Sequence, residues 1–523
     1  MPSTLTYPGV YIEEIPSAVH TITGVATSIA AFVGWAPAGP TTKATLVQSF
    51  SDYTNQFGGL DSRSLLGYSV NQFFGNGGQQ AYIIRLVDAA TVKPGTIAVP
   101  ASSGGTAFTA NAIDEGQWST QYGVRIVQNP SDATRFSLLV VYTPTATQEI
   151  TVENFSNLSM LPNDSQARYV GSVINDPLTG SQTIQIPLAS ISIVVGAQPK
   201  PNALTTPGSL PSPYKLATGN DGAVLIPGTA AFHAALNAAG GGTGGVRWLD
   251  NVSIFNLLCV PGENDAATIS SLQSYCHDQR AFFIVDCNQS DTFVSLQGGP
   301  VGLTGGNSIN SAFYFPWVNA PDQLQQGRVR PFPPCGFVAG LYAATDASRG
   351  VWKAPAGIDA SLSGESGLTV PLTDLQNGTL NIQAINCLRN FPVYGDVIWG
   401  ARTLRGNDQV GSEWKYVPIR RLALFLESSL FNGTQWVVFE PNDEPLWSQI
   451  RLNVGAFMQG LFLQGAFQGT TPQQAYFVKC DAENNPQSSI NLGIVNILVG
   501  FAPLYPAEFV VIQIQQMAGQ LQG

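Results

Sequence analysis

The sequence predicts a multidomain protein of mixed α/β and α+β class, in which a mainly β domain interrupts a mixed α/β core. Three observations carry this prediction. Apolar runs alternate with helical patterns in both halves of the chain, a Ser-, Thr-, Pro- and Gly-rich stretch with short alternating runs lies between them, and both ends carry extended segments. At 523 residues the chain exceeds what one compact core holds, so two to four domains are expected.

The amino-terminal part is predicted to be an extended arm over residues 1–24, followed by the first part of the core over residues 25–89. Ser28–Gly34 is predicted as a short buried strand, Ser64–Phe74 as a helix and Gln80–Val87 as a second strand. A glycine-rich turn separates the helix from the second strand, as expected at a helix end.

The middle of the chain, residues 90–225, is predicted as a β-rich outer domain whose Pro-rich return linker begins near Ala197. Short runs of alternating apolar residues indicate hairpins in it. These runs are Gly123–Gln128, Phe136–Tyr142, Gln148–Val152 and Ile191–Val195.

Residues 226–400 are predicted to form an α/β core domain. Val252–Val260 and Ala281–Val285 are apolar throughout and flank a helix that Asp265 could cap. Two fully apolar strands joined by a helix indicate a parallel unit covered on both faces. The further elements expected here are a helix over Gly336–Thr345 and a strand over Val397–Thr403.

Residues 401–505 are predicted to form a C-terminal inner domain of α+β type, with an exchanged strand and tail over 506–523. Its longest helix should span Asp443–Gln468, with Asn442 or Asp443 as N-cap. Apolar residues at helical spacing give this helix a side for core packing, or for contact with another polypeptide. The shorter elements expected are a helix over Val417–Leu430 and strands over Gln435–Phe439 and Ala475–Cys480.

The composition is poor in charge: 11% of residues are charged, and the formal net charge is −11. Either this is an ordinary protein of low charge, or other subunits cover much of its surface, since subunit interfaces are depleted in charge. Nucleic acid is not expected as a direct partner, because Lys and Arg are not clustered as phosphate binding requires. We expect neither membrane insertion nor a secretory signal, and therefore assembly in the cytoplasm.

Motifs for chemistry are weak, and no catalytic, cofactor-binding or metal site is predicted. The six cysteines are scattered without a CxxC pair, so buried reduced thiols are expected. Cys276, His277 and Asp278 are consecutive, and neighbours on a helix point in different directions. A cytoplasmic α/β enzyme with a β-insertion is kept as an alternative, which a converging acid, base or nucleophile would favour.

Both ends of the chain carry segments with the pattern of single strands, Thr6–Ser17 and Pro506–Met517. A lone strand leaves its backbone groups unpaired and needs a sheet edge in its own or another subunit. The residues predicted to pair with a neighbouring subunit are Tyr7, Val10, Tyr11, Ile12, Glu13, Glu14 and Ile15 at one end, and Phe509, Val510, Val511, Ile512 and Ile514 at the other.

Four spaced sequence blocks resemble contractile tail sheath proteins, in the order that this family has them. The blocks are Pro8–Glu14 with Thr27–Gly34, Gly350–Gly357, Trp399–Leu404, and Phe439–Trp447 with Ala502–Pro503 and Pro506–Val510. Matching blocks lie on both sides of residues 90–225, which themselves match nothing in the family. This stretch is therefore expected to be an insertion that faces outward.

The resemblance implies a structural subunit of a contractile sheath, in a phage tail or a phage-tail-like contractile injection system, with no enzymatic activity and no cofactor. Such subunits polymerise in hexameric or helical rings around an inner tube, exchange terminal strands, and contract to drive the tube through a target membrane. The implied partners are identical subunits, the inner tube protein, and baseplate and terminal cap proteins. The implied final location is a virion tail or an injection particle that is cytoplasmic, membrane-anchored or released.

The sequence leaves two alternatives undecided. A static shell protein is the alternative to a contracting one. The basic residues are either a solvated surface or contacts to the tube or the next ring, and the candidates are Arg402, Arg405, Arg420, Arg421 and Arg451.

Overall fold

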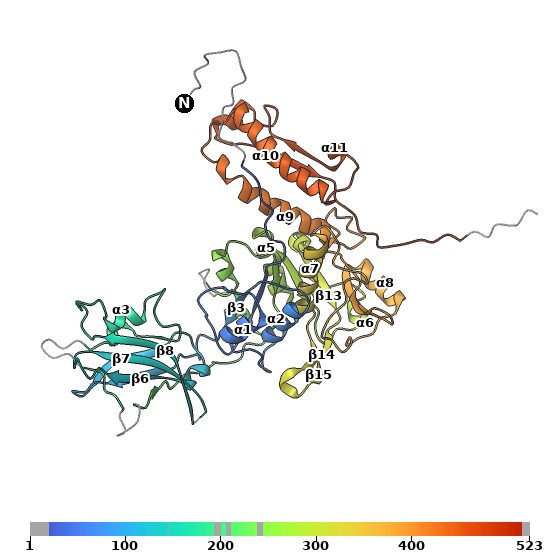
Figure 1. Cartoon of the computed structure of the whole chain (residues 1–523). Helices are drawn as coiled ribbons and strands as arrows, with labels where there is room; N and C mark the ends of the chain where they lie inside the picture. The colour runs from blue at the N-terminus through green and yellow to red at the C-terminus, as the bar shows by residue number, and fades with distance from the viewer. Residues whose placement is uncertain (1–19, 146, 193–199, 205–210, 238–243, 515–523) are drawn as a thin grey trace, which may run out of the picture. The chain divides into compact units, whose positions relative to one another are not determined.

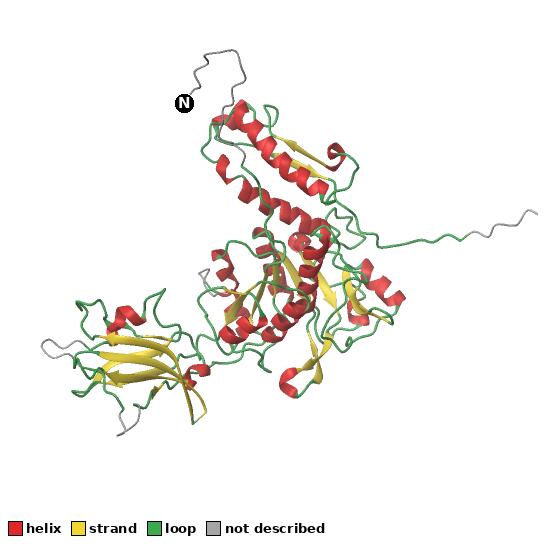
Figure 2. Cartoon of the chain, viewed as in Figure 1, coloured by secondary structure: helices red, strands yellow, loops and turns green. Residues whose placement is uncertain are grey.

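The computed structural model describes residues 20–145, 147–192, 200–204, 211–237 and 244–514. The chain divides into two compact units. Of the described residues, the core unit comprises those within 28–344 and 356–411, and the C-terminal unit comprises 20–27, 345–355 and 412–514 (Figure 1). Both helices and strands build each unit, which confirms the predicted mixed class (Figure 2).

An eight-stranded sheet lies at the centre of the core unit. In spatial order its strands are β17 (Gly395–Ile398), β16 (Ile385–Phe391), β13 (Ser311–Phe315), β12 (Phe282–Asp286), β11 (Leu257–Cys259), β1 (Ala30–Trp35), β3 (Ala81–Leu86) and β2 (Thr45–Val47). The inner strands are parallel, and each edge strand pairs antiparallel with its neighbour. The chain passes from β1 to β3 on one side and later to β11 on the other, so the sheet is doubly wound about β1.

The predicted parallel strand–helix–strand is confirmed by β11, α5 (Ala266–Asp278) and β12. Asp265 caps α5 as predicted, because its side chain accepts a hydrogen bond from the Thr268 N–H. The first strand is shorter than the predicted Val252–Val260: β11 covers Leu257–Cys259, and residues 252–256 lie in neither a helix nor a strand.

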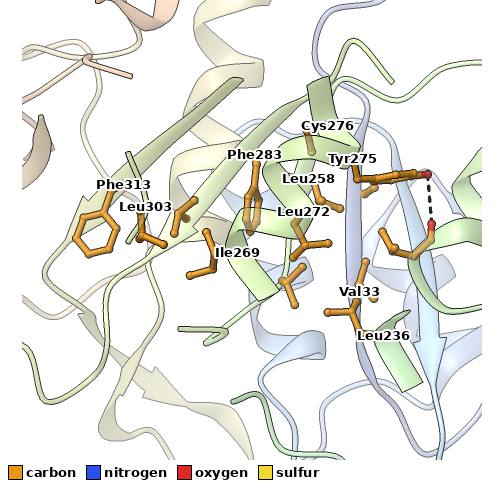
Figure 3. Packing of buried hydrophobic residues seen from close by; sticks show 14 of the residues in the cluster. Val33, Leu236, Leu258, Ile269, Leu272, Tyr275, Cys276, Phe283, Leu303 and Phe313 are labelled. Carbon is orange, nitrogen blue, oxygen red and sulfur yellow. Dashed lines mark hydrogen bonds between the residues drawn. The ribbon is translucent and has the colours of Figure 1, made fainter. Parts of the chain in front are cut away.

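Helices cover both faces of this sheet. Besides α5, the core unit contains α1 (Phe50–Phe57), α2 (Leu66–Gly75), α4 (Ala230–Asn237), α6 (Phe293–Leu296), α8 (Asp374–Ile382) and most of α7 (Cys335–Arg349). In Figure 3 the α5 side chains Leu272 and Cys276 lie among Val33, Leu258 and Phe283 of the strands. The neighbouring strand residue Phe32 points the other way, toward Phe73 of α2 at 5.4 Å between ring centroids. This alternation is what a sheet buried on both faces requires.

Two glycines allow α7 to pack closely on α2. A Cβ on Gly336 would lie 2.5 Å from the Ser69 carbonyl oxygen, and one on Gly340 would lie 2.6 Å from that of Phe73. Any larger residue would therefore push the two helices apart.

The inserted part of the core unit is a two-sheet β domain with its own core. One sheet has the order β10 (Tyr214–Lys215), β6 (Tyr122–Gln128), β7 (Phe136–Thr145), β8 (Gln148–Leu158), and the other has β4 (Thr96–Pro100), β5 (Thr106–Ala112), β9 (Ile184–Gln185), with α3 (Val170–Ile174) beside them. Side chains such as Phe108, Ile126 and Leu138 form a cluster separate from that of the large sheet. Three of the four predicted alternating runs are strands, whereas Ile191 and Ser192 are not in a strand and the rest of that run lies outside the described residues.

The C-terminal unit is built on two long helices, α9 (Val417–Gly433) and α10 (Glu444–Leu463), which were both predicted. Its other elements are α11 (Pro472–Ala475), β18 (Tyr476–Lys479), α12 (Gln487–Asn491) and β19 (Leu498–Phe501). The helices pack through Phe425 and Phe457, whose ring centroids are 6.1 Å apart. The predicted strand over Gln435–Phe439 is wrong: it begins with a 3-10 helix over Gln435–Val437, because the chain must reverse between α9 and α10.

A hairpin of β14 (Val318–Asp322) and β15 (Arg328–Phe332) completes the core unit.

Among the helices of the described chain, none combines the length and the apolar character needed to cross a bilayer.

Candidate assembly interface in the C-terminal unit

The start of the described chain is fastened to the end of α9. The His20 ring stacks on Trp436 at 4.2 Å between centroids. Ile22 is buried, and a Cβ on Gly433 would lie 2.6 Å from its Cγ2 atom. The predicted pairing residues that precede it, Tyr7, Val10, Tyr11, Ile12, Glu13, Glu14 and Ile15, lie outside the described residues.

The other end of the chain is held to the C-terminal unit as far as Glu508. The Gln468 N–H donates to the Ala502 carbonyl at 2.9 Å. The Tyr416 hydroxyl donates to a Glu508 carboxylate oxygen at 3.0 Å, and the Lys415 ammonium lies 4.0 Å from the same oxygen. These contacts fix the point at which the terminal segment leaves the unit.

Beyond Glu508 the predicted strand residues are exposed. Phe509, Val510, Val511, Ile512 and Ile514 are 75%, 80%, 81%, 79% and 93% exposed. Figure 2 draws this segment as a loop, without helix or strand. Burying a side chain of this size contributes about 2 kcal/mol, so in a lone subunit a large apolar stabilisation is left unused.

A small sheet with free edges lies in the same unit. β18 and β19 form a sheet of two strands, with Tyr476 opposite Phe501 and Lys479 opposite Leu498. The Tyr476 hydroxyl bonds Gln459 of α10 at 2.9 Å, which holds one strand against that helix. Within the described residues each strand lacks a partner strand on its other edge, and isolated two-stranded ribbons are only marginally stable.

After its first turn, which carries the exposed Glu444, α10 has an exposed row of residues that are all uncharged, with the part-exposed Arg451 beside it. Leu452 and Leu463 are 62% and 76% exposed. Ser448, one turn before Leu452, and Ala456, one turn after it, are exposed too. Most of the helix's apolar residues face the core of the unit, as predicted, so this second row offers an uncharged surface on the opposite side.

The structure gives three of the five predicted basic contacts an internal role. Arg402 is fully buried and donates to the Asp408 carboxylate at 3.0 Å and to the Asn381 carbonyl at 2.9 Å. In the C-terminal unit, Arg421 forms two bonds of 2.9 and 2.6 Å to Asp346. A guanidinium has five donors in a planar fork, and this suits it to such internal bracing.

Arg420, the third of them, is buried beside Glu427, at 3.2 Å from its carboxylate. Burial lowers the pKa of Arg420 below its usual range. The prediction that Arg402, Arg420 and Arg421 face a partner is therefore corrected, because their charges are enclosed within the subunit.

The other two basic candidates keep part of their surface. Arg405 is half-buried and donates to the Thr304 carbonyl at 3.0 Å. Arg451, on α10, is one-third exposed, pairs with Glu444 at 2.5 Å and donates to the Cys480 carbonyl. These two are the basic candidates that a partner could still reach.

The large sheet has a place where doubly wound folds commonly bind ligands, the reversal point between β1 and β11. Here Leu65 fills the approach, since a Cβ on Gly262 would lie 2.7 Å from its Cδ1 atom. The nearby buried carboxylate of Glu263 accepts the N–H groups of Gly228 and Asp265 at 3.0 and 2.8 Å and pairs with His233 at 3.1 Å. Its oxygens thus hold the local backbone together.

The remaining chemical candidates also have structural environments. Cys276 is buried, whereas His277 and Asp278 are exposed, so the three consecutive side chains diverge as predicted. Burial raises the pKa of the Cys276 thiol. All six cysteines are buried and free, and no cluster of three metal-ligating side chains occurs in the described part of the chain.

Sequence reasoning missed several exposed residues of the C-terminal unit. Phe477 and Leu498 are 54% and 52% exposed on the small sheet, and Phe439 is 102% exposed. Phe439 lies in the block Phe439–Trp447 that resembles tail sheath proteins, but nothing in the sequence pattern distinguishes an exposed aromatic residue from a buried one.

The sequence of this chain is similar to those of known tail sheath proteins. Residues 409–517 match the family described as phage tail sheath C-terminal domain. The tail sheath protein of Vibrio phage KVP40 is 30% identical over 166 residues, which is 31% of this chain and 23% of that protein. A putative prophage major tail sheath protein of Pseudomonas aeruginosa is 27% identical over 285 residues, or 52% of this chain and 69% of that protein. The chain thus spans about a quarter of the Vibrio phage relative.

Solved structures extend the likeness to nearly the whole chain. The helical sheath of the anti-feeding prophage in its contracted state matches with a TM-score of 0.57 at 23% identity, covering 98% of this chain and 100% of that one. Its fold is therefore that of the sheath proteins, and the predicted resemblance is confirmed.

Proposed function

We propose that this chain, a protein of the tail sheath fold whose residues 409–517 match the phage tail sheath C-terminal domain, is the structural subunit of a contractile sheath. Many copies would polymerise around an inner tube, and their contraction would drive that tube through a target membrane. The observation that carries the proposal is an exposed apolar segment, Phe509–Ile514, on a unit that also contains a sheet with free edges.

These two features support strand exchange between copies. The segment offers unpaired backbone groups and apolar side chains, and the β18–β19 sheet offers edges that need both. Because every copy carries a donor segment and an acceptor sheet, the contact repeats from copy to copy and builds a polymer. The amino-terminal residues Tyr7–Ile15 are proposed as a second donor.

Such links suit a contraction. Backbone bonds between strands are directional and can be kept while compact units rotate, so two packings of the same units can interconvert. The difference in surface buried between the two packings would supply the energy. The exposed uncharged row of α10 (Ser448, Leu452, Ala456 and Leu463) is proposed to face the inner tube. Arg405 and Arg451 are proposed as contacts to an acidic surface of the tube or the next ring.

The ends of such a polymer need other partners, for which we propose a baseplate and a terminal cap protein. Assembly is proposed to take place in the cytoplasm, with the finished sheath in a phage tail or an injection particle.

The substitution Val511→Pro tests the proposal. Val511 is 81% exposed, so its replacement should leave the unassembled subunit folded, whereas proline removes a donor from the exchanged strand. We expect normal circular dichroism and a large loss of tubes, measured by pelleting and electron microscopy. The matched control is Val511→Thr, which keeps the N–H group and a β-branched side chain and should assemble.

Two further results bear on the proposal. Normal tubes from Val511→Pro would contradict strand exchange at this end. Hollow cylinders of two lengths and widths in preparations of the wild-type protein would support a contractile sheath over a static shell, and particles of one fixed form would support the shell.

A further inference from the structure

Phe439, in the loop between α9 and α10, combines two unfavourable features. Its side chain is 102% exposed. Its backbone φ is +72°, in the left-handed region that residues with a Cβ avoid at a cost of roughly 1–2 kcal/mol. Asparagine or glycine would adopt this backbone more easily, and a polar side chain would be better hydrated. Neither feature of this residue helps the isolated subunit.

The loop is nevertheless held in a defined conformation. The Glu440 N–H donates to the Val437 carbonyl at 3.2 Å. The Asn442 side chain accepts the Trp447 indole N–H at 2.9 Å and donates to the Ile494 carbonyl at 3.0 Å. Asn442 therefore ties the loop both to α10 and to the segment that leads into β19.

The surroundings of Phe439 have the character of an interface. Val438 next to it is 59% exposed, and Ile494, which Asn442 holds, is 45% exposed. The border is acidic, since Glu440, Asp443 and Glu444 are all exposed. A single aromatic anchor with apolar neighbours and a charged border is the arrangement found at energetic centres of protein interfaces.

We infer that Phe439 is an anchor by which one subunit binds a second copy of this chain, its ring entering an apolar site bordered by basic or neutral groups on that copy. The inference rests on the proposed function and adds a contact to it. The second copy is the partner because the loop is bonded to Ile494, close to β19, whose free edge is proposed to receive a strand of another copy.

The substitution Phe439→Asn separates this role from a role in folding. Asparagine suits the backbone and removes the ring, so the thermal midpoint of the unassembled subunit should stay the same or rise. The protein concentration needed for tube formation should rise by about thirtyfold or more, the effect of losing an interface hot spot. The control is Phe439→Tyr, which keeps an aromatic ring on the same backbone and should assemble within about threefold of wild type.

Each outcome has a defined meaning. Assembly of Phe439→Asn at the wild-type concentration overturns the inference, and so does a fall in the thermal midpoint of the unassembled subunit, because the ring would then support the fold. Failure of the proposed function is distinguishable: wild type and Phe439→Tyr would then form no tubes either.

Discussion

A single carboxylate, that of Asp286, joins two segments that are distant in the chain. It lies at the end of β12 with its oxygens accepting the N–H of Gly262 at 3.0 Å and the N–H of Cys335 at 2.8 Å. It therefore connects the loop after β11 to the first turn of α7. Burial raises the pKa of Asp286 to about 6, although both N–H groups favour the charged form.

This pKa makes stability depend on pH in a predictable direction. Between the ordinary value of 3.8 and about 6, the folded protein holds a proton that the unfolded chain has lost. The free energy of unfolding therefore falls as the pH rises through this window and is level above it. Relative to Asp286→Asn, which does not titrate, wild type should lose on the order of 2–3 kcal/mol from pH 4 to 7.

Urea unfolding of both proteins across this pH range measures the effect, with the difference between the two curves as the readout. A difference that does not change with pH would show that Asp286 keeps an ordinary pKa in the folded protein.

The ion pair of Arg421 and Asp346 makes a second prediction at this scale. Both side chains are 3% exposed, and Arg421 also donates to the Thr27 carbonyl at 2.9 Å. Asp346→Asn would leave a buried guanidinium without its countercharge, so we expect a loss of about 3–5 kcal/mol in the free energy of unfolding.

A matched exposed pair provides the control. Lys479 and Glu483 are paired at 2.5 Å with Glu483 82% exposed, and Glu483→Gln should cost no more than about 1 kcal/mol. Denaturant unfolding of the two variants measures both. Equal small losses would mean that the buried pair contributes no more than a surface pair.

At the level of elements, the sequence predicted those whose pattern is strong and local. β1, β3, α5, α9 and α10 were all predicted within a few residues, because apolar periodicity and a cap at Asp265 suffice to define them. The prediction of a strand over Gln435–Phe439 was wrong because its apolar residues are not packed as in a sheet. Trp436 stacks on His20, which is distant in sequence, and Phe439 is exposed.

Only part of the candidate interface could be predicted, because its other features depend on residues distant in sequence. The sequence singled out Phe509–Ile514 as strand-forming residues in need of a partner, and in the subunit these side chains are exposed, while their pairing with another copy stays a prediction. β19, in the sheet that we propose as the acceptor, was not predicted, because it is a short strand that pairs with β18 alone. The burial of Arg421 could not be predicted from the sequence either. Its partner Asp346 is distant in sequence, in the segment 345–355 that belongs to the C-terminal unit.

At the level of the whole molecule, the β domain is an insertion that begins and ends at one place. Lys93 and Asn220 exchange backbone hydrogen bonds of 3.0 and 2.9 Å. Near this point Asp221 accepts the Gln117 N–H at 2.7 Å and pairs with Arg63 at 3.1 Å. A single antiparallel bridge thus joins the segments that carry the chain into the domain and back, with a few polar contacts around it.

This topology predicts that the β domain can be removed without loss of assembly. Replacing residues 94–219 by two glycines would close the pair of Lys93 and Asn220 with a two-residue turn, the shortest that an antiparallel pair accepts. The large sheet and the insertion have separate hydrophobic clusters, so we expect the shortened chain to fold, to unfold cooperatively, and to form tubes of normal pitch but smaller outer diameter. Circular dichroism and electron microscopy test this, with the single change Asp221→Asn as a control for damage at the base of the domain. Should the shortened chain fold but stay unassembled while Asp221→Asn assembles, the β domain would have to contribute to contacts between subunits, and its expected outward position would be wrong.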